Sequence, residues 1–110
     1  MERNKDFVYL DKFKWDTWKN DKNKIDHKVS FETASRIFDD PFLYTEYDEE
    51  NSLKHNEYRE RNIGTVGGIA VLLVASTDTE DGKIRIFSAR KAETQEVRIY
   101  EQNAKAILGN

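Results

Sequence analysis

Residues Phe13–Asp40 read FKWDTWKNDKNKIDHKVSFETASRIFDD and give the clearest signals for secondary structure in the chain. Asp16 and Ser30 are of the residue types that cap helix N-termini, so this stretch predicts two helices, the first running to about His27. The second helix is expected to end before Pro41. Its apolar residues recur at helical spacing and define one buried face: Phe31, Ala34, Ile37 and Phe38.

The first of these helices is mostly polar. Trp18 and Ile25 lie seven residues apart and predict its buried stripe, while Trp15 precedes the cap as a hydrophobic staple. Aromatic side chains can stack on RNA bases, but their helical spacing favours burial. The interpretation of the following set is therefore a shared core: Trp15, Trp18, Phe31, Phe38 and Phe42.

Strands are predicted on both sides of this helical stretch. Upstream, Phe7–Leu10 and Phe13–Trp15 read as a short strand or an N-terminal arm. Downstream, a polar acidic loop over 48–56 and a turn over 78–82 separate four expected strands: Phe42–Tyr47, Glu57–Val66, Ile69–Ser76 and Lys83–Ala89. Gly67-Gly68 suits a tight hairpin between the second and third of them. A last helix is expected from Thr94, with Val97, Tyr100, Ala104 and Ile107 on one face.

This order of elements predicts the fold class. A strand, two helices, three or four antiparallel strands and a final helix make an α+β domain, with an antiparallel sheet packed against helices on one face. The 110 residues are expected to form a single domain over 1–110, long enough to bury one core. The other face of such a sheet is open to host a site.

Composition excludes several classes of protein. The chain contains no cysteine, so disulfide frameworks and thiolate metal sites are ruled out. The charged N-terminus, MERNKD, lacks the apolar region of a secretion signal, and the longest apolar run, Gly67–Ala75, is too short to span a bilayer. We expect a cytoplasmic protein without a membrane segment. Neither a phosphate-binding glycine loop nor metal-ligand spacing is present, so no cofactor and no metal are expected.

The distribution of charge limits where nucleic acid can bind. Residues 29–57 carry 2 basic and 8 acidic groups, whereas residues 1–28 carry 8 and 6, and residues 58–110 carry 8 and 7. Phosphate contacts supply most of the affinity for nucleic acid. A nucleic-acid site is therefore expected to draw on the two ends of the chain, and the acidic middle is expected to repel phosphate or to face a basic partner.

A second block, KIRIFSARKAETQEVRIYE, runs from Lys83 to Glu101. The two blocks, in this order and this far apart, resemble the BrnT family of bacterial toxins, the ribonucleases of type II toxin–antitoxin pairs. The resemblance implies a RelE-like architecture and an endoribonuclease held inactive by a cognate antitoxin of the ribbon-helix-helix type. It also implies that DNA is bound only by the complex with that antitoxin, and that RNA is the substrate.

The resemblance also implies site residues. Cleaving RNA without metal needs groups that move protons and cations that stabilise the pentacovalent phosphate. By their motif positions we expect His27, Arg59 and Arg85 to be catalytic and to converge on one surface. Lys19, Lys28 and Arg90 are expected to bind substrate.

Several residues keep structural interpretations beside the catalytic ones. His27 suits a helix C-cap, Arg85 suits a packed ion pair, and Asn23 is expected to bridge backbone groups. His55 matches nothing in the family and reads as a solvated surface residue. Asn23 and Lys19 both match family positions, four residues apart on one helix face.

Three positions depart from the family pattern. Asp26 and Lys28 replace the lysine and glycine of a K-H-G motif, and Thr79 stands in a turn that carries an arginine in the family. The mismatch predicts that Asp26→Lys raises ribonuclease activity. These losses of positive charge favour, as the alternative function, a catalytically weakened module of the same fold that binds an antitoxin-like partner. A direct DNA-binding regulator is disfavoured by the net charge of −3.

Overall fold

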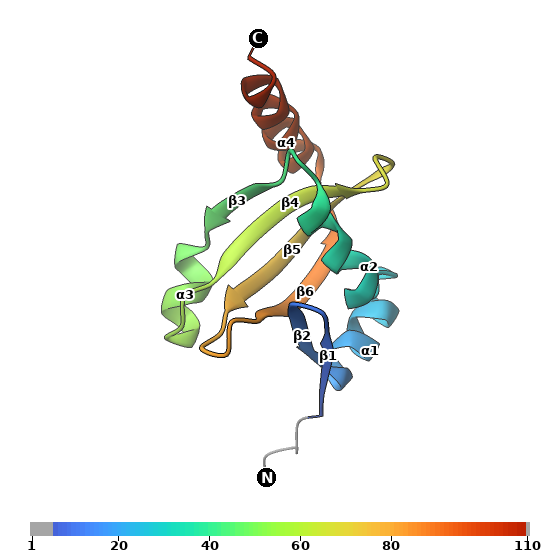
Figure 1. Cartoon of the computed structure of the whole chain (residues 1–110), viewed down its shortest axis with the longest axis vertical. Coiled ribbons are helices and arrows are strands. Elements are labelled where there is room, and N and C mark those ends of the chain that lie inside the picture. The colour runs from blue at the N-terminus through green and yellow to red at the C-terminus, as the bar shows by residue number, and fades with distance from the viewer. Residues whose placement is uncertain (1–5, 110) are drawn as a thin grey trace.

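The computed structural model of the chain describes residues 6–109, so most of the charged N-terminal segment MERNKD lies outside the described residues. One six-stranded sheet has the order β1-β2-β6-β5-β4-β3 (Figure 1). Its strands are β1 (Phe7–Leu10), β2 (Phe13–Asp16), β3 (Tyr44–Tyr47), β4 (Glu60–Val66), β5 (Ala70–Asp78) and β6 (Ile84–Lys91). The helices are α1 (Thr17–His27), α2 (Phe31–Ser35), the 3-10 helix η1 (Arg36–Asp39), α3 (Glu49–His55) and α4 (Thr94–Ile107).

The predicted α+β fold class is confirmed. Ser30 caps α2 by accepting a hydrogen bond from the Thr33 amide, and the glycine pair Gly67-Gly68 turns β4 into β5. The core lies between α2, η1 and one face of the sheet, where Phe31, Ala34, Ile37, Val74 and Ile86 are fully buried. One pairing departs from the antiparallel pattern, because β2 joins β6 in parallel. β2 and β6 are separated by most of the chain, so no short hairpin constrains their direction.

An amide, rather than an apolar stripe, docks α1 on the sheet. The expectation for Trp18 and Ile25 was wrong, because their exposed fractions are 52% and 72%. The buried residue of α1 is Asn23. Its side chain donates to the carbonyls of Val29 and Ala89 and accepts from the Ala89 amide, at 2.8–3.1 Å. Asn23 therefore bridges backbone groups, as predicted, and fixes α1 beside β6.

α3 replaces the predicted acidic loop over 48–56. Asp48 is buried and caps this helix, accepting a hydrogen bond from the Asn51 amide at 3.2 Å. Glu49 and Glu50 occupy the first turn, where the helix dipole favours carboxylates, and Asn56 ends the helix in the left-handed conformation. Capping and charge placement thus outweigh the polar composition that suggested a loop.

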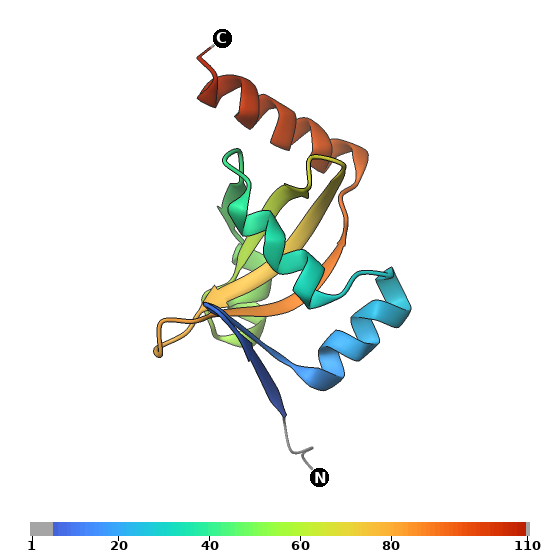
Figure 2. The ribbon, with the colours of Figure 1, turned by 45° about the vertical axis from the view of Figure 1, so that its right-hand side comes forward.

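α4 does not lie on the face of the sheet that α2 covers, so the helices are not all on one face as predicted. It begins on the opposite face, near Ile63 and Leu73, and then crosses the end of the sheet. Figure 2 shows α4 at the end of the molecule opposite the β1–β2 hairpin. Its Tyr100 donates a 2.6 Å hydrogen bond to Asp40, which also accepts from Thr65. Burial alone would raise the pKa of Asp40, but these bonds outweigh it and hold that pKa below its ordinary value.

A bulge interrupts β6 at Phe87. Ser76 of β5 pairs with Ile86 and Ala75 pairs with Ser88, so Phe87 has no partner across the ladder. Ile84 and Ile86 face the helices, and Arg85 projects from the other face. The extra residue re-aims the side chain at position 87, a common use of bulges beside functional sites.

No helix within residues 6–109 is long and apolar enough to cross a membrane.

Candidate functional site

Three cationic side chains converge on the ring of Phe87. The guanidinium carbon of Arg59 lies 3.9 Å from the ring centroid, that of Arg85 lies 5.1 Å from it, and the Lys19 ammonium nitrogen lies 5.3 Å from it. We call these four residues the cation cluster. Such distances are those of cation–π contacts, in which the electron-rich faces of a ring attract positive charge.

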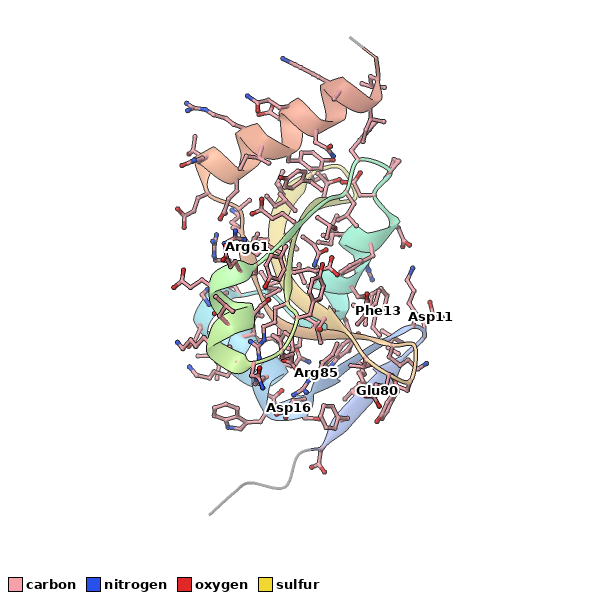
Figure 3. All side chains as sticks on the ribbon, turned by 90° about the vertical axis from the view of Figure 1, so that its left-hand side faces the viewer. Asp11, Phe13, Asp16, Arg61, Glu80 and Arg85 are labelled. Carbon is pink, nitrogen blue, oxygen red and sulfur yellow. The ribbon has the colours of Figure 1, made fainter. Side chains whose placement is uncertain are left out.

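Residues far apart in the sequence build this cluster. Lys19 comes from the first turn of α1, which Asn23 holds against β6, and Arg85 and Phe87 come from β6 around its bulge. Arg59 precedes β4, and Ser52 of α3 fixes its backbone by accepting from its amide at 2.7 Å. Figure 3 shows Arg85 in the lower half of the molecule, level with Asp16, and Arg61 higher up. Three separate elements thus deliver one positive site.

The two arginines of the cluster differ in how far their charges are compensated within residues 6–109. Arg59 forms an ion pair with Glu57 at 3.1 Å, and its side chain is 14% exposed. Arg85 forms no ion pair within residues 6–109, and its Nε is buried without a hydrogen-bond partner. A guanidinium that has no ion-pair partner beside other cations favours an anionic ligand, since a bound phosphate offsets its charge.

His55 is exposed, as predicted, and it lies close enough to Arg59 and Lys19 for their charges to act on its imidazole. It is the last residue of α3, one turn beyond Ser52, which binds the Arg59 backbone. Loss of hydration lowers the pKa of His55, and the nearby charges of Arg59, Lys54 and Lys19 lower it further, against the opposing effect of Glu57. A neutral imidazole can accept a proton. The signal that could have found it was the cap pattern of α3.

The structure places His27 elsewhere. His27 and Lys28 line a groove of about 560 Å³ at the far end of α1, together with Lys91 and the apolar residues Val29, Val66, Ile69, Ala70 and Leu72. Eight residues of helix separate His27 from Lys19, which is about 12 Å along the axis. The expected convergence of His27 with Arg59 and Arg85 is therefore not observed, because α1 points its C-terminus away from them.

Two further residues from the sequence patterns are engaged in local pairs. Arg90 binds Glu96 through two hydrogen bonds of 2.8 Å, which holds the start of α4 on the sheet. This bidentate pair raises the pKa of Arg90 and lowers that of Glu96. Asp26 pairs with Lys22 one turn earlier at 2.5 Å, and this bond lowers the pKa of Asp26. Neither residue reaches into the cation cluster by these contacts.

Within residues 6–109, no group of three or more histidine or acidic side chains is placed to hold a metal ion. The chemistry that the cluster itself offers is the binding of an anion by fixed cations, with an imidazole nearby to transfer a proton.

Comparison with known proteins identifies the family. The family model described as the ribonuclease toxin BrnT of a type II toxin–antitoxin system matches residues 15–96, well over half of the chain. The chain belongs to the BrnT family. Its fold is also similar to the crystal structure of the Brucella abortus ribonuclease toxin BrnT, with a TM-score of 0.56 and 17% identity over 73% of this chain and 94% of that one. No curated protein sequence matches the chain.

The BrnT family match covers the cation cluster but not the outermost elements of the fold. Residues 15–96 include Lys19, His55, Arg59, Arg85 and Phe87, so the entire cation cluster lies within the family segment. β1, the start of β2 and most of α4 lie outside it. These outer elements pack on a BrnT core that already contains the cluster.

Proposed function

We propose that this BrnT-family protein is a metal-independent endoribonuclease and that the cation cluster is its active site. The observation that carries the proposal is the convergence of Lys19, Arg59 and Arg85 on Phe87 at 3.9–5.3 Å. Family membership supplies the reaction class, and the cluster supplies a place for it. The proposal omits His27, Lys28 and Arg90, which the structure places in other settings.

The chemistry follows from what RNA offers. A 2′-hydroxyl loses its proton, attacks the neighbouring phosphorus and displaces the 5′-oxygen of the next nucleotide, which takes a proton from water. In the proposed site, neutral His55 accepts the first proton, and the guanidinium groups of Arg59 and Arg85 stabilise the extra negative charge on the phosphate. Lys19 binds the phosphate before reaction. Fixed cations in a partly buried site stabilise such charge more than mobile ions in water do.

A cognate antitoxin is the expected partner, because toxins of type II systems are paired with a protein antitoxin. We propose that it is of the ribbon-helix-helix type, that it covers the cation cluster, and that DNA is bound only through the complex. The net charge of −3 supports this division, since the chain alone has a weak general attraction for DNA.

The test is cleavage by the purified chain of an unstructured RNA in a chelator-containing buffer at low salt. We expect cleavage by the wild type and a loss of about 10²–10³-fold in kcat for Arg85→Ala, the usual cost of removing one transition-state donor. Arg98→Ala is the matched control, because Arg98 is an exposed arginine on α4. Circular dichroism checks that both variants are folded. Full activity of Arg85→Ala would remove the cluster from the mechanism.

A catalytically weakened binding module is the second candidate. Two observations favour it: Arg59 is paired with Glu57, and Thr79 stands where the family has an arginine. This candidate predicts tight binding of the antitoxin and no RNA cleavage by the wild type. Expression of the chain alone in bacteria separates the two, because only the ribonuclease arrests growth with loss of mRNA and is rescued by the antitoxin.

A further inference from the structure

β1 is a strand that the family match does not include, and it forms the outer edge of the sheet next to the cation cluster. Its register aligns three residues across three strands. Tyr9 pairs with Lys14 of β2, and Lys14 pairs with Arg85 of β6. Residues opposite one another in a sheet share a face. Tyr9, Lys14 and Arg85 therefore form one row on the face that carries the cluster.

Phe7 shapes the cluster from this strand. The guanidinium carbon of Arg85 lies 5.1 Å from the Phe7 ring and 5.1 Å from the Phe87 ring. Arg85 thus contacts two aromatic rings, while its Nε has no hydrogen-bond partner. Ring contacts orient a guanidinium without neutralising it, so its remaining N–H groups stay available for an anion.

Tyr9 is the exposed member of the row. Its exposed fraction is 60%, and it lies two residues along β1 from Phe7, on the same face. The Lys14 ammonium lies 5.9 Å from the Tyr9 ring and 5.8 Å from the Phe7 ring, and it donates a 3.0 Å hydrogen bond to Asp81. Lys14 is therefore held in place between the tyrosine and the arginine.

The spacing of the row suits one extended nucleotide. Adjacent strands lie about 4.8 Å apart, so two steps place the backbone of Tyr9 about 10 Å from that of Arg85. A nucleotide whose phosphate contacts Arg85 can extend its base across Lys14 to the Tyr9 ring. Stacking of bases on exposed aromatic side chains beside cationic grooves is how proteins bind single-stranded RNA.

We propose that β1 extends the active site into a base-binding subsite, in which Tyr9 stacks on a nucleobase of single-stranded RNA whose phosphate lies on Arg85. Phe7 is a positioning residue that holds the Arg85 guanidinium. The inference rests on the proposed ribonuclease function for its substrate, but it concerns binding and can be tested without cleavage.

The probe is a short 2′-O-methyl RNA that carries one 2-aminopurine. It lacks the attacking hydroxyl, so it is not cleaved, and its fluorescence falls when the base stacks. We expect saturable quenching by the full chain. Tyr9→Ala should abolish the quenching and raise the Kd roughly 5- to 150-fold, the range that corresponds to stacking of about 1–3 kcal/mol per base. Tyr9→Phe keeps the ring and should restore wild-type binding.

Tyr58→Ala is the matched control, since Tyr58 is a comparably exposed tyrosine that stacks on Tyr47 instead. Quenching and affinity unchanged in Tyr9→Ala, with RNA still bound, would overturn the subsite. Quenching lost equally in Tyr58→Ala would also overturn it, because the base would then bind elsewhere. Wild-type quenching without cleavage of ordinary RNA would instead overturn the ribonuclease function and leave the subsite in place.

The role of Phe7 has its own measurement. The Arg85 Nε–H is buried against two rings, so its NMR signal is displaced by their ring currents and protected from exchange. Phe7→Leu should shift this signal, raise the Kd for the probe and lower kcat, while Phe7→Tyr should restore all three. A signal that does not move in Phe7→Leu would overturn the positioning role.

Discussion

The two ends of α1 carry similar charge but very different surroundings. At its N-terminal end, Lys19 joins Arg59 and Arg85 around one aromatic ring. At its C-terminal end, His27 and Lys28 border a groove whose other residues are mainly apolar. The N-terminal end of α1 differs from the C-terminal end because its cations converge on one point, and this convergence, rather than the number of cations, suits the binding of a phosphate. The groove instead combines apolar surface with positive charge along its border, the composition of a protein-binding surface.

The difference also shows how little a motif match says about position. His27 stands at the histidine of a family motif, yet the helix that carries it directs it to the groove. His55 has no motif match, yet α3 ends beside Arg59. Proton transfer requires a group within hydrogen-bond reach of the reacting oxygen, so the fold, and not the motif, selects the histidine.

The largest expected effect separates the two histidines. His55→Ala should lower kcat by about 10²–10⁴-fold, the usual contribution of a general acid or base, whereas His27→Ala should change it by about twofold or less. The pKa of His55 is lowered below the ordinary imidazole value of 6.5, so His55 is neutral at pH 7. Activity should then decline only as the pH falls below 6.5, where the imidazole becomes protonated and can no longer accept a proton. The reverse ranking of the two variants would move the active site to the groove.

Substitution of Asn23 tests whether the two ends of α1 both depend on the hydrogen bonds of this one side chain. Asn23→Ala leaves three buried backbone groups of Val29 and Ala89 without partners. We expect the free energy of unfolding to fall by about 2–4 kcal/mol, measured by urea denaturation. Lys24→Ala, on the exposed side of α1, should cost less than about 0.5 kcal/mol. Equal stability of the two variants would contradict the anchoring role of the amide.

Lys19 and Lys28 offer a matched pair of lysines from the two ends. Lys19→Ala should raise the KM for RNA about tenfold, because it removes a charge-assisted contact with phosphate. Lys28→Ala should leave the KM unchanged. Steady-state cleavage at several salt concentrations measures both, and the wild type and Lys28→Ala should share the steeper salt dependence. A higher KM for Lys28→Ala than for Lys19→Ala would place RNA in the groove.

The smallest effect is expected at Asp26. The family motif alone predicts that Asp26→Lys raises activity, but Asp26 pairs with Lys22 at the groove end of α1. We now expect less than about a twofold change in cleavage, typical of a surface substitution far from chemistry. An increase of tenfold or more would restore the motif-based interpretation and extend the RNA path along α1.

Much of the fold could be predicted because periodic patterns record burial directly. The apolar face of Phe31, Ala34 and Ile37, the cap at Ser30 and the glycine hairpin all appear in the structure as expected. α1 was misinterpreted because its buried residue is an amide. Hydrophobic periodicity does not reveal a helix that is held against the sheet by side-chain hydrogen bonds. α3 was missed because a segment with six polar residues out of seven resembles a loop unless the residues that cap it are considered.

The candidate site was predicted only in part. Lys19, Arg59 and Arg85 were found by motif position, and the structure brings them together. The bulge at Phe87, and so the place of its ring between three cations, has no signature in a single sequence. His55 depends on a helix that was not predicted. Local patterns report each element by itself, so the convergence of Arg59 with Arg85 was expected only from the family resemblance, and the position of Lys19 beside them had no local signal.

The bulge at Phe87 has a consequence for how the chain can change. Before it, even-numbered residues of β6 face the helices, and after it odd-numbered residues do, as Ile86 and Ala89 show. The bulge therefore changes which residues of β6, even-numbered or odd-numbered, face the helices. Deleting this one residue would restore a regular alternation in which Ile86 and Ala89 still face the helices and Arg90 still faces away from them, but it would remove the ring on which the three cations converge. A relative that lacks this residue could therefore keep the same core, whereas relatives that conserve the cluster should conserve the length of this strand.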